Sequence, residues 1–241
     1  TSTSDSGRRR TVYLVPFFAC SAKLPVFAFF SSLFFGKHRI AVIAALYLTG
    51  IAVGLLSVLP FRGKEGSSYM LELPEYRLPR VKNVLRNLSD RCTDFVKRAF
   101  TVIFLASVVC WALGYFDLSF HHAKEGESIL ALLGGIVAPI LEPLGFGDAR
   151  LAAALVAGLF AKEAVLSSLA VTPGVSSIAS LFPAGRSVCA FLVFFLLYPP
   201  CLAAFAATRK ELSSFARACL HTLARLLLAY AAAAVINNIP F

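Results

Sequence analysis

Long apolar stretches alternate with short polar ones along most of the chain. The apolar stretches cover residues 11–35, 40–59, 101–115, 128–141, 151–171, 188–208 and 215–239. An α-helix needs about 20 apolar residues to cross a bilayer. The pattern predicts an all-α fold, a polytopic bundle of transmembrane helices with six or seven membrane segments. Residues 128–141 are short for a crossing, so a span and a re-entrant segment both stay open, although the distribution of basic residues favours a span.

Residues 61–98 follow a different pattern. A linker rich in glycine and proline leads into a stretch whose apolar residues recur every three or four positions, with basic residues between them. This spacing is typical of an amphipathic helix. Because its polar face is basic, we expect the helix to lie on the cytoplasmic surface of the membrane. A solvated helix packed against another domain is the alternative.

Composition supports a membrane protein. Of the 241 residues, 58% are hydrophobic and 15% are charged, whereas about 25% of the residues of a soluble domain are charged. The formal net charge of +10 comes from basic residues that lie mostly between the apolar stretches, and no interleaving of aromatic and basic residues indicates nucleic-acid binding. The six cysteines have no regular spacing, which argues against a disulfide framework or a zinc module.

Two prolines interrupt the first apolar stretch. Pro16 and Pro25 each lack a backbone N–H, so a helix through them would be broken and would leave carbonyl groups without a donor. Inside a membrane, such backbone is tolerated only where protein or a water-filled cavity covers it. Lys23 lies between the two prolines, and we expect it to face a cavity or a partner. The alternative is a kinked helix whose lysine reaches the membrane interface.

A second break is predicted within residues 188–208, at the sequence Tyr198-Pro199-Pro200-Cys201. The residue before a proline is kept out of the helical conformation, so the tandem prolines predict a discontinuous helix with Cys201 at the break. Cys20 likewise lies beside a proline-containing break. Thiols suit soft or borderline metals better than sodium, magnesium or calcium. A buried cysteine is otherwise an ordinary small apolar side chain, and this interpretation also stays open.

Two adjacent charges lie near the middle of residues 151–171. Side chains of neighbouring residues on a helix point about 100° apart, so Lys162 and Glu163 are each expected to reach a different partner or a shared aqueous path. If the helix is shifted, they mark its end instead. Ser167 follows one turn later and offers an oxygen ligand or a helix contact.

The other polar groups indicate no chemistry. His221 and Arg225 share one face of the last apolar stretch, and we interpret both as structural; if that helix starts late, Arg225 can reach the interface. The sequence contains no phosphate-binding loop, no H-E-x-x-H motif and no G-x-S-x-G motif. Enzyme chemistry is therefore not predicted.

Five motifs, in order, resemble those of the FeoB family of ferrous-iron transporters. They are Val15-Pro16-Phe17 with Cys20-Ser21-Ala22-Lys23-Leu24-Pro25-Val26-Phe27, Glu72-Leu73-Pro74-Glu75-Tyr76-Arg77-Leu78-Pro79 with Lys82-Asn83-Val84-Leu85, Leu144-Gly145-Phe146, Ala161-Lys162-Glu163 and Tyr198-Pro199-Pro200-Cys201. Each motif alone is modest, but their order is specific, and together they cover nearly the whole chain from about residue 11.

The resemblance implies Fe²⁺ import across the bacterial inner membrane by a multi-pass protein. It divides the chain into a polar basic tail (1–10), part of a first gate-type repeat (11–60), the linker with its interfacial helix (61–98) and a C-terminal membrane region with a second repeat (99–241). Broken helices in corresponding positions of two repeats mark the binding sites of many transporters. The candidate metal ligands are then Cys20 and Cys201, the candidate polar path comprises Ser21, Lys23, Lys162, Glu163 and Ser167, and the helix breaks are at Pro16, Pro25, Pro199 and Pro200.

The chain also departs from the family. We expect the family's GTP-binding domain and the membrane segment before residue 11 to be missing, and we predict no enzyme activity. Fe²⁺ would be the transported substrate, no cofactor would be permanently bound, and GTP would act only through a missing domain or a partner. The expected partners are the lipid bilayer, an N-terminal half or GTP-binding domain on another chain, and a second copy of this chain. Two other functions stay open: a membrane scaffold that docks a GTP-binding partner, and a gate-type permease for another solute such as a nucleoside.

Overall fold

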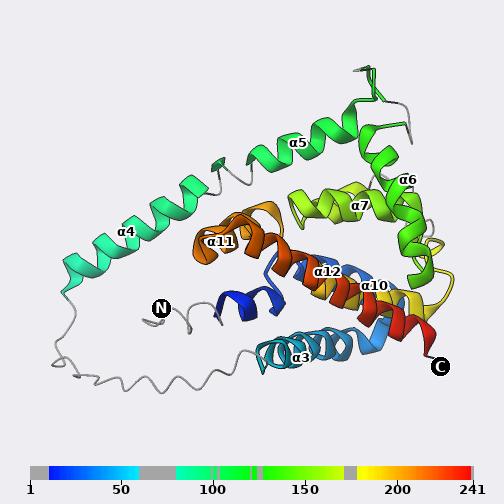
Figure 1. Cartoon of the computed structure of the whole chain (residues 1–241), viewed down its shortest axis with the longest axis horizontal. Helices are drawn as coiled ribbons and strands as arrows, with labels where there is room; N and C mark the ends of the chain where they lie inside the picture. Colours follow the sequence, from blue (N-terminus) through cyan, green and yellow to red (C-terminus); the bar gives the residue numbers. More distant parts are fainter. Residues whose placement is uncertain are drawn as a thin grey trace.

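The computed structural model describes residues 11–59, 80–98, 100–101, 104–119, 121–123, 127–170 and 178–239. The predicted N-terminal tail (1–10) and the predicted linker at residues 61–79 lie outside this part of the chain. In chain order the elements are η1 (Val15–Phe17), α2 (Leu24–Phe35), η2 (Gly36–His38), α3 (Arg39–Val58), α4 (Val81–Arg98), α5 (Phe104–Tyr115), α6 (Ile129–Leu141), η5 (Glu142–Leu144), α7 (Ala149–Phe160), α8 (Ala164–Ala170), α10 (Gly185–Leu197), α11 (Leu202–Leu212) and α12 (Phe215–Asn238). The described residues form helices and, apart from these, one isolated β-bridge, which confirms the predicted all-α membrane fold (Figure 1).

Breaks make many of the helices shorter than predicted. By length and apolar composition, Leu24–Ser57 and Phe215–Asn238 could each cross a membrane. Two bent pairs also qualify if each is taken as one span: α6–η5 with α7, bent by 107°, and α10 with α11, bent by 41°. α5 has only 12 residues, too few to cross a bilayer alone. The described residues thus hold two to four candidate spans, where the sequence predicted six or seven segments.

α6 and α7 fold back on each other. Ser128 caps α6, and its Oγ accepts a hydrogen bond from the Ala131 N–H at 3.1 Å. After η5 the chain turns at Gly145, whose φ of +83° is accessible mainly to glycine. The bend of 107° is that of a broken span or a re-entrant hairpin, so residues 128–141 do not continue straight into α7.

The core is built around α10. From Ala190 to Tyr198 almost every side chain is buried. α12 packs along α10 (Figure 1), and α2 and α3 also contact α10. Phenylalanine rings fill the interface with α2: the ring of Phe27 lies edge-on to that of Phe195, with centroids 6.1 Å apart. α10 is therefore held on several sides, and its C-terminal end lies inside the protein.

Two glycines on α3 bring that helix close to the first break. A Cβ built at Gly50 would lie 2.9 Å from the carbonyl oxygen of Phe17. At Gly54 it would lie 3.2 Å from the Cβ of Phe17. Small residues four apart allow such close contact between membrane segments. The position of η1 thus depends on the absence of side chains on this face of α3.

Replacing Gly134 by alanine should disturb the α6–α7 hairpin, because its Cβ would lie 2.5 Å from the backbone oxygen of Ala149. Gly135→Ala is the matched control, since nothing lies within 4 Å of the Cβ that it would add. We expect Gly134→Ala to lower the free energy of unfolding by about 1–3 kcal/mol and Gly135→Ala to change it by less than about 1 kcal/mol. Reversible unfolding of the chain in detergent micelles measures both. Equal effects of the two substitutions would contradict the close packing of α6 on α7.

Candidate functional site

The first break separates η1 from α2. Pro16 lies in η1, the backbone is extended at Phe18 (ψ 144°), and the chain then turns at residues 21–23 into α2. Pro25 lies in the first turn of α2, where no helical hydrogen bond requires a backbone N–H. Cys20 is exposed and directly precedes the turn, in which its carbonyl oxygen accepts a hydrogen bond from the Lys23 N–H at 3.0 Å.

The second break separates α10 from α11, at the predicted place. α10 ends at Leu197, the backbone is extended at Tyr198 (ψ 145°), and the tandem prolines follow. Cys201 is the N-cap residue of α11 and is partly buried. Cys201 therefore lies directly at the start of α11, whereas Cys20 lies within the first break, before the turn that leads into α2.

A third break interrupts the predicted segment 151–171. α7 ends at Phe160, Ala161 is extended (φ −144°, ψ 126°), and α8 begins at Ala164. Lys162 and Glu163 thus lie in a turn between two helices, which is the alternative that the sequence left open. Lys162 is buried whereas Glu163 is exposed, so the two adjacent charges lie in different environments.

The C-terminal end of α10 presents carbonyl groups that need donors. The last carbonyls of a helix have no intrahelical partner, and the prolines that follow α10 have no N–H to offer. These residues are buried, and an unpaired buried polar group costs about 1–3 kcal/mol. Three basic side chains from three other segments supply the donors: Lys23, Lys162 and Arg225.

Each lysine binds one carbonyl. Lys23 Nζ donates to the oxygen of Leu196 at 2.5 Å, and Lys162 Nζ donates to the oxygen of Pro199 at 2.7 Å. Both lysines are only 3% exposed. Lys162 Nζ also lies 4.4 Å from the ring centroid of Tyr198, within the range of a cation–π interaction. Lys23 therefore has an internal partner, as predicted, and does not reach the interface as a kinked helix would require.

Arg225 connects the two proline breaks. Its Nη2 donates to the carbonyl oxygen of Pro16 at 2.7 Å and lies 3.3 Å from that of Tyr198 and 3.4 Å from that of Leu197. α12 begins at Phe215, well before this position, and Arg225 is 2% exposed. The helix does not start late, so Arg225 does not reach the interface, and its contacts agree with the structural role that was predicted. An arginine so far inside an apolar helix was itself the signal for an internal partner.

Tyr198 joins α10 to α7. Its hydroxyl donates to the carbonyl oxygen of Leu155 at 3.0 Å. Together with the bond from Lys162 to Pro199, this contact fixes the second and third breaks against each other. The sequence placed Tyr198 in a motif but indicated no role for its hydroxyl.

The cations and the candidate cysteines form one electrostatic cluster. Lys23, Lys162 and Arg225 interact electrostatically with one another, and both lysines also interact with Cys20 and Cys201. Among the described residues, no group of three or more histidine, cysteine, aspartate or glutamate side chains is arranged to hold a metal ion. A metal bound by both thiols would therefore need further ligands of another kind, such as water or backbone oxygen.

The other residues of the predicted polar path lie on the surface of the chain. Ser21, Glu163 and Ser167 are all exposed, beside the first and third breaks. Ser167 Oγ donates to the carbonyl oxygen of Ala164 at 3.1 Å, the local bond that helical serines often make. Lys23 and Lys162 thus meet at the C-terminal end of α10, whereas Ser21, Glu163 and Ser167 stay at the surface.

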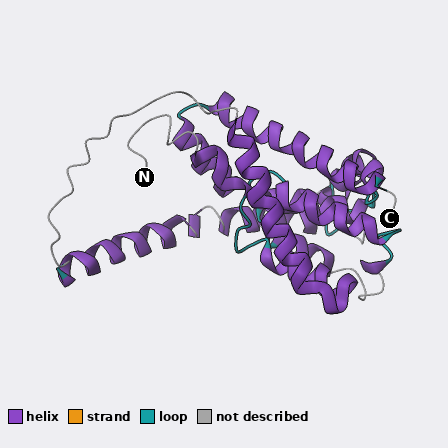
Figure 2. Cartoon of the chain, turned by 90° about the horizontal axis from the view of Figure 1, so that it is seen from below, coloured by secondary structure: helices purple, strands orange, loops and turns teal. Residues whose placement is uncertain are grey.

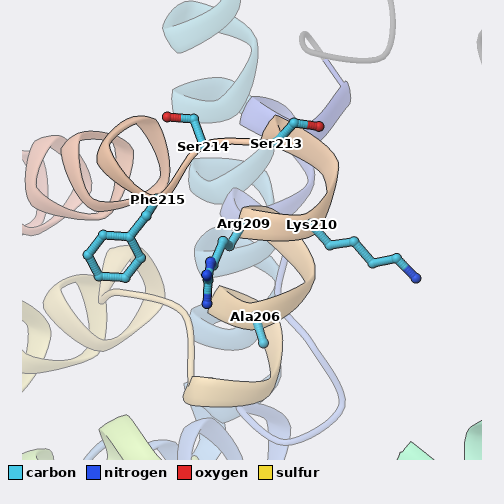
Figure 3. Close-up of a pocket in the computed structure, with 6 residues that line it drawn as sticks. All are labelled: Ala206, Arg209, Lys210, Ser213, Ser214 and Phe215. Atoms are coloured by element: carbon cyan, nitrogen blue, oxygen red, sulfur yellow. The ribbon is translucent and has the colours of Figure 1, made fainter.

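A basic hollow lies at the opposite end of α11 from Cys201. Figure 3 shows its lining: Ala206, Arg209, Lys210, Ser213, Ser214 and Phe215. Arg209 lies over the ring of Phe215, 5.5 Å from its centroid, while Lys210 points away from the hollow. Both basic side chains are exposed, which is the expected state of a helix–helix turn at a membrane surface.

Two protein families match the chain. Residues 43–91 match the family described as ferrous iron transport protein B C terminus, and residues 96–215 match the Gate family, described as nucleoside recognition. No solved structure matches.

Similar full-length proteins are ferrous-iron transporters. The Fe(2+) transporter FeoB of Staphylococcus aureus (strain MSSA476) is 34% identical over an alignment 236 positions long, which covers 94% of this chain and 36% of that protein. The Fe(2+) transporter FeoB of Methanocaldococcus jannaschii is 32% identical over an alignment 256 positions long, which covers 99% of this chain and 38% of that protein. The chain thus spans little more than a third of the length of these relatives.

Arg225→Met should destabilise the chain far more than Arg209→Met. Both arginines lie over a phenylalanine ring, but only Arg225 is buried and bound to carbonyl oxygens. Methionine keeps much of the apolar bulk and leaves those carbonyls without their donor, so we expect a loss of about 3 kcal/mol in the free energy of unfolding. Arg209→Met should cost less than about 1 kcal/mol. Unfolding in micelles measures both, and a mild effect of Arg225→Met would refute its role in holding the breaks.

Proposed function

Since this chain belongs to the FeoB family of ferrous-iron transporters, we propose that it forms part of the path by which Fe²⁺ crosses a membrane. The observation that carries the proposal is the pair of proline-containing breaks, each with a cysteine between a proline and the helix that follows. Transporters commonly bind their substrates at such discontinuities. The described helices are those of a multi-pass membrane protein, and we propose the bacterial inner membrane as its location.

The proposed metal ligands are Cys20 and Cys201. Thiolates bind borderline cations such as Fe²⁺ well and bind Na⁺, Mg²⁺ or Ca²⁺ poorly. Both cysteines lie within electrostatic range of the same two lysines, which supports their acting together. Fe²⁺ would displace one proton from each thiol, so that two S–H bonds are replaced by two Fe–S bonds and two protons leave.

Charge determines what this site can hold. Three buried cations surround the end of α10, and they repel a divalent cation across a medium of low dielectric constant. Binding as two thiolates makes the metal and its sulfur ligands electrically neutral together. The neutral group is not repelled by the nearby cations, so Fe²⁺ can bind beside the lysines.

The small number of protein ligands favours transport of Fe²⁺ over its permanent binding. The carbonyls of Leu196 and Pro199 already accept hydrogen bonds from lysine, so water is the ready source of further ligands. Conduction requires that an ion bind strongly enough to enter and weakly enough to leave. Two thiols completed by water meet this requirement better than a full set of protein ligands.

The exposed polar residues would form the approaches to this site. Ser21 follows Cys20 directly, and Glu163 follows Lys162 in the third break. A carboxylate and a hydroxyl both suit a hydrated cation. We assign Glu163, Ser21 and Ser167 to the hydrated part of the path, and Lys23 and Lys162 to holding the breaks in place.

Energy would come from outside this chain. The curated relatives are almost three times as long, and we propose that a GTP-binding domain or partner drives the gates. GTP would act there and Fe²⁺ would be the only ligand of this segment, which itself would catalyse no reaction.

A nucleoside is the second candidate substrate, because the Gate family that matches residues 96–215 is described as nucleoside recognition. The two candidates differ in a competition assay. We expect excess uridine to leave ⁵⁵Fe²⁺ uptake unchanged and unlabelled Mn²⁺ or Co²⁺ to reduce it, since these cations accept the same ligands. Uptake of labelled uridine that Fe²⁺ does not inhibit would favour the second candidate.

Replacing Cys20 and Cys201 together by serine should abolish Fe²⁺ uptake. The assay uses cells that lack ferrous-iron uptake and express the chain with the remaining parts of a FeoB transporter. We expect a loss on the order of tenfold or more, because even the outer partners of metal ligands contribute that much. The matched control is Cys92→Ser with Cys219→Ser, which removes two thiols on α4 and α12 that lie outside the breaks.

A second readout needs only the purified chain. Co²⁺ bound to thiolate absorbs in the near ultraviolet, and its binding should release roughly two protons per metal ion. The control variant should retain both signals. Normal uptake and normal proton release in the Cys20→Ser, Cys201→Ser variant would show that the cysteines are not metal ligands.

A further inference from the structure

α4 stands apart from the helical bundle. Figures 1 and 2 show it as a separate arm, and every side chain described between Val81 and Lys97 is exposed. α4 is too polar to be a candidate span. A helix of 18 residues without a packing partner is marginal in water, because most helical stability in proteins comes from an apolar face packed against something. Something outside the described residues therefore has to cover α4.

One side of α4 is apolar along its whole length. Its members recur every three or four residues: Val81, Val84, Leu85, Leu88, Cys92, Phe95 and Val96. Phe95 is 71% exposed and Val81 is 72% exposed, so large apolar groups at both ends of the helix are uncovered. The apolar face is continuous and straight, as contact with a flat surface requires.

The charges on α4 are sorted around this face. On a helix of 3.6 residues per turn, Lys82 and Arg91 lie directly to either side of the apolar face. Asp90 and Asp94 lie on the opposite side of the helix, together with Arg86 and Lys97. Positive charge thus borders the apolar face and negative charge is kept away from it.

We propose that α4 lies in the membrane surface and binds anionic phospholipid headgroups. The apolar face enters the boundary between headgroups and acyl chains, Lys82 and Arg91 meet phosphates at its edges, and the two aspartates face water. A charged lipid layer offers an apolar interior bordered by negative groups, which is the complement of this pattern. A groove on a soluble protein would not require bases along both edges.

The chain connections agree with this placement. α4 is followed after five residues by the apolar helix α5, and the apolar helix α3 precedes it in the chain. Five residues reach at most about 18 Å, so the end of α4 cannot lie far from the start of α5. An apolar helix of the membrane region therefore holds α4 near the bilayer.

Cys92 provides a probe at the centre of the apolar face. A spin label is attached to Cys92 in a variant whose other five cysteines are replaced by serine, and the whole chain is placed in nanodiscs of phosphatidylcholine with or without phosphatidylglycerol. The control moves the label two positions, to Asp90→Cys in a Cys92→Ser background. Collisions of the label with oxygen, which concentrates in lipid, and with a water-soluble nickel chelate report its depth.

We expect the label at Cys92 to lose collisions with the nickel chelate when phosphatidylglycerol is present, and the label at position 90 to keep them. Replacing Lys82 and Arg91 by glutamine should remove the dependence on phosphatidylglycerol. Equal water access at both positions would overturn the proposal. So would protection of Cys92 that is the same without anionic lipid, or that persists in detergent, because the cover would then be neutral lipid or protein. None of these readouts depends on iron transport.

Discussion

The whole arrangement depends on the buried carbonyl groups at the C-terminal end of α10. A helix that stops inside a membrane protein leaves acceptors that neither lipid nor the following prolines can satisfy. Lys23, Lys162 and Arg225 satisfy them from three different segments. Because each donor is a long side chain with a charged end, its own burial is tolerated only while these bonds exist. The break and its three cations are therefore stable together or not at all.

The sequence predicts those parts of the fold and the site that a single residue type determines. The prolines at 16, 199 and 200 remove backbone donors, and the second break lies where they predict it. The third break could not be predicted in this way, because Ala161 and Lys162 are compatible with a helix, and the contact between Lys162 and Pro199 forms only in the folded protein. The partners of Arg225 could not be predicted for a related reason: the sequence shows that a buried arginine needs acceptors, but it does not show which distant carbonyls are free.

The same contacts shape the proposed metal path. The lysines occupy carbonyl oxygens that a cation would otherwise find attractive, and they bring positive charge to the place where Fe²⁺ would pass. If the proposal holds, such a site would reject ions that bind only through charge, such as Na⁺ or K⁺. It would accept a metal that can exchange protons for sulfur ligands. Selectivity would then arise from chemistry at the thiols, with the cations acting as a barrier to simpler ions.

A single nitrogen atom, Nη2 of Arg225, lies within hydrogen-bonding distance of carbonyl oxygens from both proline breaks. If either break shifts relative to α12, it stretches its hydrogen bond to Nη2, the same atom that binds the other break. The two interruptions are thus mechanically linked, and the favourable motion is a joint one in which both follow the last helix. In an alternating-access cycle, such a shared pivot would make the two halves of the proposed path move in concert and would suppress states in which only one of them has rearranged.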